Sequence, residues 1–246
     1  MDRALYVAMS GAAQTLRAQA VNHHNLANAS TVGFKAELAV AGGVNVQGTG
    51  FGSRINAQSF MAGTDGSAGG LQATGRTLDI ALKPDQWLAV QGADGREVYT
   101  KGGDLTLDAT GTLRTASGLT VLGDGGPITL PPATTVDIGG DGTVSVIPAG
   151  QSGAQAVTAG KLKVVTASSA QLERSGNGVF SAKPGFTPET ATGSVLTSGA
   201  LESSNVNVAD AMVTMIELAR NFELQTRAMK AADENAQQAA SLVRMK

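Results

Sequence analysis

Residues 205–246 read NVNVADAMVTMIELARNFELQTRAMKAADENAQQAASLVRMK, and this stretch decides the fold because it predicts one long helix. Neither Gly nor Pro occurs from Val208 onward, so the stretch can form a single rod of roughly 55–60 Å. Asn207 is placed to cap the first turn with its side-chain oxygen, and Asp210 favours the exposed N–H groups there. Apolar side chains recur along the rod at alternating steps of four and three: Val208, Met212, Met215, Ala219, Phe222, Met229 and Val243.

A second helix with the same spacing is predicted at the N-terminus. It stops near Asn28, before Gly33, where the sequence has the residues of a helix end. The two helices can pack as a hairpin within one chain, but the C-terminal helix overhangs the other and its stripe is too wide for one neighbour to cover. We therefore expect both stripes to be buried between subunits. The N-terminal stripe consists of Leu5, Met9, Ala12, Leu16 and Leu26.

Composition excludes several classes of protein. The chain has no cysteine, which rules out disulfides and thiolate chemistry. Its net charge of −2 comes with scattered Lys and Arg, so we expect no nucleic-acid partner. No apolar run is long enough to span a membrane directly. The first residues do not have the order of a cleaved secretory signal, so any export is expected to use another route.

Between the helices the sequence changes character. Residues 34–70 are rich in Gly, Ala, Val and Asn and predict an extended connector. Residues 71–198 contain short runs of alternating apolar and polar residues, which predict an antiparallel all-β domain with Trp87 as a core residue. The fold class is therefore α+β, with the terminal-helix domain formed by residues 1–33 and 199–246. Glycine-containing hairpin turns are expected at Ala93-Asp94-Gly95, Ala109-Thr110-Gly111 and Gly140-Asp141-Gly142.

No catalytic, cofactor-binding or metal site is predicted. His23 and His24 are the only histidines, and adjacent residues on a helix point about 100° apart, so they cannot bind one metal together. Phosphate-binding glycine loops and zinc-binding or nucleophile motifs are absent from the sequence. We expect a protein that is not an enzyme.

Two segments resemble the signature of a known family. Asn25–Lys35 (NLANASTVGFK) is similar to the Asn-Leu-Ala-Asn-x-x-Thr-x-Gly-Phe-Lys segment of bacterial flagellar rod and hook proteins, and Gly199–Asn207 (GALESSNVN) to their Gly-x-Leu-Glu-x-Ser-Asn-Val-Asn segment. Within the family, Asp85–Gln91 and the N-terminal residues resemble the proximal rod protein most, with the distal rod protein as second choice. The matching residues are Asn25, Leu26, Ala27, Asn28, Gly33, Phe34, Lys35, Leu201, Ser204, Asn205, Val206 and Asn207.

The resemblance implies a structural subunit of the flagellar basal-body rod. It implies that the terminal helices pack as a coiled coil in a tubular, helical assembly that transmits motor torque towards the distal rod and hook. Export through the flagellar type III apparatus to the periplasm, without a cleaved signal peptide, is implied as well. The implied partners are copies of the chain and rod proteins of the FlgB, FlgC, FlgG and FliE types. Two alternatives remain from the residues alone: a secreted β-rich adhesin, and a peptidoglycan-acting enzyme with an unrecognised site.

Overall fold

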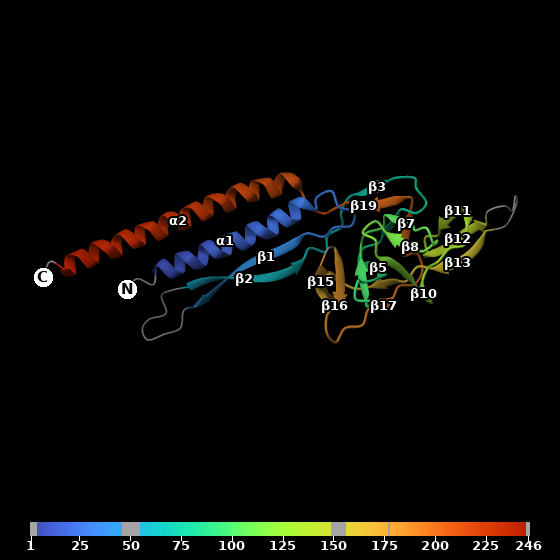
Figure 1. The fold of residues 1–246 in the computed structure, drawn as a ribbon, viewed down its shortest axis with the longest axis horizontal. Helices are drawn as coiled ribbons and strands as arrows, with labels where there is room; N and C mark the ends of the chain where they lie inside the picture. The colour runs from blue at the N-terminus through green and yellow to red at the C-terminus, as the bar shows by residue number, and fades with distance from the viewer. Residues whose placement is uncertain (1–3, 46–54, 149–155, 177, 245–246) are drawn as a thin grey trace. The chain divides into compact units, whose positions relative to one another are not determined.

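The structure is a computed structural model that describes residues 4–45, 55–148, 156–176 and 178–244. These residues form two compact units (Figure 1). The helical unit takes its described residues from 1–27, 37–63 and 207–246, and the β-unit takes them from 28–36 and 64–206. Four chain crossings therefore connect the two units, and the segment 28–36 belongs to the β-unit although it follows the first helix directly.

The helical unit contains two helices and two strands: α1 (Ala4–Ala27), β1 (Glu37–Asn45), β2 (Ile55–Thr64) and α2 (Val208–Arg244). The helices run antiparallel and side by side (Figure 1). Asn22 Nδ2 donates a hydrogen bond to the Ala211 carbonyl at 2.8 Å, and a Cβ placed on Gly11 would lie 2.9 Å from Gln225 Cδ. The first contact pairs the end of α1 with the start of α2, and the second pairs the first half of α1 with the middle of α2. The two predicted terminal helices are confirmed, and they pack against each other within one chain.

The predicted connector of residues 34–70 is extended but not isolated. β1 and β2 form a two-stranded sheet, and β1 packs along α1. Residues 46–54 of the predicted connector lie outside the described residues. The strand pairing supplies partners for the backbone N–H and C=O groups, which a solitary extended segment would leave to water.

The β-unit is built from many short strands, as the alternating runs predict. Its largest sheet has ten strands, and the main path through it runs β15-β16-β6-β5-β9-β8-β7. A three-stranded sheet, β11-β12-β13, and the pairs β18-β4 and β19-β3 complete the unit. The strands are β3 (Leu71–Ala73), β4 (Ile80–Leu82), β5 (Gln86–Gln91), β6 (Glu97–Thr100), β7 (Leu105–Leu107), β8 (Leu113–Thr115), β9 (Thr120–Gly123), β10 (Gly126–Pro127), β11 (Ala133–Ile138), β12 (Thr143–Pro148), β13 (Val157–Lys161), β14 (Val164–Thr166), β15 (Leu172–Gly176), β16 (Val179–Ala182), β17 (Glu189–Thr190), β18 (Leu196–Ser198) and β19 (Ala200–Glu202).

Two hydrophobic clusters form the core of the β-unit. The larger joins buried side chains of β4, β5, β9 and β12, and the smaller surrounds Trp87. Trp87 is buried as predicted, and its Nε1 donates to the Ala167 carbonyl at 2.8 Å. The three predicted turn glycines Gly95, Gly111 and Gly142 have φ of 79°, 79° and 87°, which only glycine adopts without strain.

Candidate functional site

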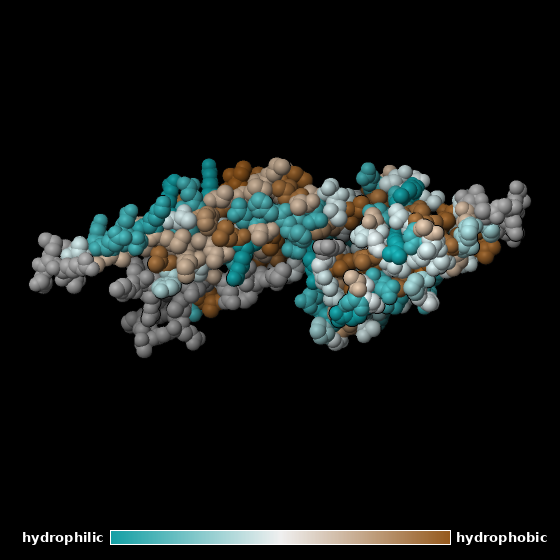
Figure 2. Space-filling model, in the orientation of Figure 1, coloured by the Kyte–Doolittle hydropathy of each residue, from teal (hydrophilic) through white to brown (hydrophobic). Residues whose placement is uncertain are grey.

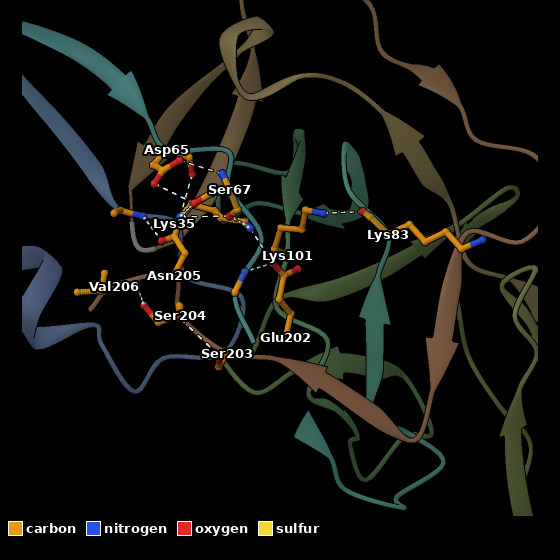
Figure 3. Close-up of polar contacts among 12 residues, drawn as sticks. Lys35, Asp65, Ser67, Lys83, Lys101, Glu202, Ser203, Ser204, Asn205 and Val206 are labelled. Atoms are coloured by element: carbon orange, nitrogen blue, oxygen red, sulfur yellow. Dashed lines mark hydrogen bonds and ion pairs between the residues drawn. The ribbon is translucent and has the colours of Figure 1, made fainter. Parts of the chain in front are cut away.

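The two family-like segments meet within the β-unit. The Gly33 N–H donates to the Glu202 carbonyl at 2.7 Å, and the Asn205 N–H donates to the Phe34 carbonyl at 3.3 Å. Segments some 170 residues apart in the chain therefore lie side by side (Figure 3). The sequence identifies both segments but does not by itself show that they touch.

A buried ion pair lies at the centre of this contact. Lys35 Nζ lies 2.7 Å from Glu202 Oε1, and the two side chains are 2% and 3% exposed. Lys35 Nζ also donates to the Ser67 carbonyl at 2.7 Å, and the Gly69 N–H donates to Glu202 Oε1 at 2.9 Å. Because an unpaired buried charge is costly, each of these two residues strongly stabilises the other in its buried position. We call this group of residues, together with Asn205, the polar anchor (Figure 3).

Asn205, on the same segment as Glu202, adds further hydrogen bonds to the polar anchor. Its Oδ1 accepts from the Ala36 N–H at 2.8 Å, while its Nδ2 donates to the carbonyls of Asp65 and Ser67 at 3.2 Å each. One amide of the segment that leads to α2 therefore satisfies backbone groups of the segment that leads to β1 and of the segment that follows β2. No other uncharged side chain offers a donor and an acceptor in this arrangement except Gln, which is longer.

Gly33 is required by both its backbone and its surroundings. Its φ is 65°, and a Cβ at this position would lie 2.3 Å from the carbonyl group of Lys101. The next residue, Phe34, is buried, and the Arg174 guanidinium carbon lies 4.9 Å from its ring centroid. Arg174 also donates to the Lys35 carbonyl. The Gly-Phe-Lys segment is thus fixed by close backbone packing, by a cation–π contact and by an ion pair.

The contact with Arg174 continues into the core as a row of cationic side chains and aromatic rings. Arg174 lies 5.1 Å from the ring centroid of Phe180, and the Phe180 and Trp87 rings meet edge to face at 4.8 Å. Lys101 Nζ lies 5.4 Å from the centroid of the Trp87 ring at the far end. Arg174 belongs to no sequence pattern, so its role could not be predicted. The row connects the segment before β1 to the smaller hydrophobic cluster.

The asparagines of the signature form hydrogen bonds at the ends of helices and at the start of a strand. In the helical unit, Asn25 Nδ2 donates to the Glu37 carbonyl at 2.9 Å and Asn25 Oδ1 accepts from the Glu37 N–H at 2.8 Å. Asn207 Oδ1 accepts from the Ala209 N–H at 3.0 Å, which confirms the predicted cap of α2. In the β-unit, the Asn28 carbonyl accepts from the Thr31 N–H at 3.1 Å in the turn after α1.

The remaining signature residues make smaller contributions. Ser204 Oγ accepts from the Val206 N–H at 3.2 Å. Leu26, Leu201 and Val206 are half-buried, whereas Ala27 is exposed.

The predicted interface residues divide into two groups on the helical unit. One face of α2 contains Ala211 and Gln225, which contact α1, and on this face Met215, Phe222 and Met229 are half-buried. The other predicted positions of α2, Val208, Met212 and Ala219, are exposed, as are Leu5, Met9 and Leu16 of α1. Ala12 is buried and Leu26 half-buried, and the Val243 side chain lies outside the described part of the structure.

Hydrophobic side chains gather at the start of α2 on the face shown in Figure 2. Met212, Val213 and Ile216 are 52%, 56% and 61% exposed, and we call them, with Val208, the free face of α2. Residues 233–241 are exposed as well, in agreement with the predicted overhang of the C-terminal helix. The apolar stripe is therefore only partly covered by α1.

The described residues contain no cluster of three or more His, Cys, Asp or Glu side chains able to hold a metal ion. His24 instead lies beside Glu37, with Nδ1 3.2 Å from Oε1. Among the helices of the described chain, none is long and apolar enough to cross a membrane.

Comparison with known proteins identifies the family. Residues 5–35 match the flagella basal body rod protein family, residues 81–146 the flagellar hook protein FlgE/F/G D1 domain, and residues 197–242 the flagellar basal body rod FlgEFG protein C-terminal family. The chain is 40% identical to the flagellar basal-body rod protein FlgF of Escherichia coli and 41% identical to FlgF of Salmonella typhimurium, in each case over 100% of both chains. It is 33% identical to FlgG of Bacillus subtilis over 99% of this chain and 100% of the relative. The resemblance inferred from the signature segments is thereby confirmed, and the chain belongs to the FlgE/F/G family of bacterial flagellar basal-body rod proteins, with full-length similarity to its FlgF members.

Proposed function

We propose that this structural rod subunit assembles through the free face of α2, which packs against helices of neighbouring rod subunits in a tube. The observation that carries the proposal is the exposure of Met212, Val213 and Ile216 on a helix whose other apolar face already packs against α1. Monomeric proteins rarely leave neighbouring large apolar side chains exposed on one element unless a partner covers them.

The free face is large enough to contribute substantially to assembly. Fully burying one Val, Ile or Met side chain stabilises a contact by about 1.5–3 kcal/mol. Several such side chains from each subunit must offset the loss of translational and rotational freedom and of side-chain motion on association. In a helical array every subunit repeats the contact, so modest individual contacts add up to a stiff shaft that can transmit torque.

The polar anchor supports this role from the β-unit. Its hydrogen bonds and ion pair fix the backbone at the segments that continue into β1 and α2. Buried charge pairs of this kind specify one geometry even where they add little net stability. We assign the anchor the task of setting where the chain leaves the β-unit on its way to the helices.

The partners proposed are further copies of this chain and rod proteins of the FlgB, FlgC, FlgG and FliE types. The FlgG relative, similar over nearly the whole chain, supports a shared architecture for such contacts. The proposed route is the flagellar type III apparatus, without a cleaved signal peptide, and the proposed location is the periplasmic part of the basal body. The alternatives of an adhesin or a peptidoglycan-acting enzyme have no support in the comparisons, whose matches are rod and hook proteins.

The proposal is tested by placing a charge on the free face. In a strain that lacks its own copy, Ile216→Asp should abolish swimming and rod completion, whereas the purified variant keeps the circular dichroism and melting temperature of the wild type because the side chain is 61% exposed. Asn221→Asp is the matched control, since Asn221 is exposed and lies nine residues, or about 180°, from Met212 around the helix. It adds the same charge and should leave swimming intact. Normal swimming of the Ile216→Asp strain would overturn the proposal.

A further inference from the structure

Lys101, directly after β6, is a buried cation that the polar anchor does not neutralise. Lys101 is only 3% exposed, and its Nζ donates to the Lys83 carbonyl at 2.7 Å (Figure 3). Among the described residues no carboxylate forms an ion pair with it, and Glu202 is engaged by Lys35. An ammonium has three donors. The Lys83 carbonyl takes one of them, and the Trp87 ring lies 5.4 Å from Lys101 Nζ, so the group keeps hydrogen-bonding capacity for a further acceptor.

A cleft in the β-unit opens beside this ammonium. It has a volume of about 200 Å³ and is lined by Lys101, Lys35 and Glu202 together with apolar residues. The apolar lining consists of Ala68, Leu71, Ala81, Leu82 and Pro84. Leu71 is 71% exposed, so the cleft is open to solvent on this side. The cleft thus combines a cationic end with apolar walls.

Burial makes the charge of Lys101 costly in the isolated chain. The pKa of Lys101 is lowered to about 8, chiefly because burial removes the ammonium from water; the Glu202 charge opposes this effect, the Lys35 charge adds to it and the Asp85 charge opposes it. Near neutral pH the group is still mostly protonated. A negative charge placed in the cleft would offset this cost by pairing with the ammonium.

We propose that the cleft beside Lys101 is a binding site for an aliphatic carboxylate, with the carboxylate on Lys101 Nζ and a short hydrocarbon stem against Leu71, Leu82 and Pro84. The cleft volume suits a stem of a few carbons and not a large ligand. Two kinds of molecule can supply such a carboxylate: a free short-chain carboxylic acid, or the glutamate side chain of another protein chain. The site lies wholly within the β-unit, so this proposal does not depend on the proposal that the free face of α2 contacts neighbouring subunits.

The test uses the full-length protein with ¹³C-labelled lysine, and NMR follows the Cε signal of Lys101 as a function of pH. Butyrate should produce a saturable shift of this signal and raise the pKa of Lys101 by one unit or more, because the carboxylate favours the protonated amine. Butyramide, which has the same shape without the charge, should produce neither effect. An absent or non-saturable effect of butyrate, or an equal effect of butyramide, overturns the proposal.

Two variants control for the site. Lys83→Met removes an exposed lysine of the same cleft, whose Nζ bonds Ser194 Oγ and not Lys101, and should keep butyrate binding. Lys101→Met should lose it, as measured by the signals of the other lysines around the cleft; binding that persists in this variant overturns the proposal. The wild-type titration needs no variant, so the proposal stays testable even if Lys101→Met does not fold.

A second ligand distinguishes the sources. Glutamate blocked by an acetyl group and an N-methylamide presents the side chain as a protein does. If it competes with butyrate, a glutamate of another chain is the ligand; if butyrate binds and blocked glutamate does not, the ligand is a free short-chain acid. Both outcomes support a carboxylate site, and binding of neither compound refutes it.

Discussion

Glu202→Gln removes the negative charge from the polar anchor while keeping the shape of the side chain. Lys35 then stays buried, with its side chain 2% exposed, and retains only neutral acceptors such as the Ser67 carbonyl at 2.7 Å. Removing one partner of a buried ion pair costs about 3–5 kcal/mol. Because the amide oxygen can still accept from the Gly69 N–H, we expect the lower end, about 3 kcal/mol of unfolding free energy.

Trp87 provides the assay for this variant. It is the only tryptophan of the chain and lies in the core of the β-unit, so its fluorescence during urea unfolding reports on that unit alone. With a slope of about 2 kcal/mol per molar urea, the loss corresponds to a midpoint about 1.5 M lower. The double variant Lys35→Met with Glu202→Leu removes both charges and should recover most of the loss, because apolar replacement of a buried pair is often neutral.

A Glu202→Gln midpoint within 0.2 M, or about 0.4 kcal/mol, of the wild type would refute the reasoning. So would a double variant as unstable as the sum of its single replacements, because the ion pair would then contribute no coupling between residues 35 and 202.

Three further outcomes are expected. Gly33→Ala should destabilise the β-unit by more than about 2 kcal/mol, because strain at positive φ adds to a clash with the Lys101 carbonyl. The control Gly75→Ala, at φ 72° with open space around it, should show the strain alone. Equal losses of stability for the two variants in the Trp87 assay would contradict the close packing at Gly33. The pKa of Lys101 is about 8 in the folded chain and 10.5 in the unfolded one, so the unfolded state binds more protons between these two pH values. The free energy of unfolding, relative to that of Lys101→Met, should therefore rise by about 2 kcal/mol from pH 8 to pH 10. Parallel curves of unfolding free energy against pH for the two proteins would contradict the burial of a charge. Burial raises the pKa of Tyr99 to about 12, so above pH 10 its hydroxyl ionises in the unfolded chain but not in the folded one. The free energy of unfolding should therefore fall above pH 10, and Tyr99→Phe should remove that fall.

Much of the fold follows from local patterns in the sequence. The cap at Asn207, the uninterrupted helix after it and the turns at Gly95, Gly111 and Gly142 depend on near neighbours in the chain, and the structure has them as predicted. The strand from Glu97 to Thr100 lies in the region of alternating residues that predicts the β-domain. Strands as short as β8 (Leu113–Thr115) are not predicted, because three residues are too few to establish a period and such a strand forms only beside its partners, here β7 and β9.

The candidate site was predictable only in part. The signature identifies Lys35 and Asn205, but the pairing of Lys35 with Glu202 joins residues distant in sequence and requires the folded β-unit. Arg174 belongs to no motif, and the importance of Arg174 and Lys101 comes from their contacts with Phe34 and Trp87, which no local pattern encodes. The sequence predicts an apolar stripe on α2 that is too wide for one neighbour, and part of this stripe is exposed in the structure. The sequence could not show which of its residues α1 covers.

The central claim is that other subunits cover the free face of α2. The chain has no cysteine, so Ile216→Cys introduces a single thiol for labelling with a maleimide, and Arg96→Cys, on the exposed turn between β5 and β6, provides a control. In the purified subunit both thiols should react rapidly. In isolated basal bodies the thiol at position 216 should become protected at least tenfold while that at position 96 keeps reacting. Equal labelling of position 216 in subunit and basal body would contradict the account.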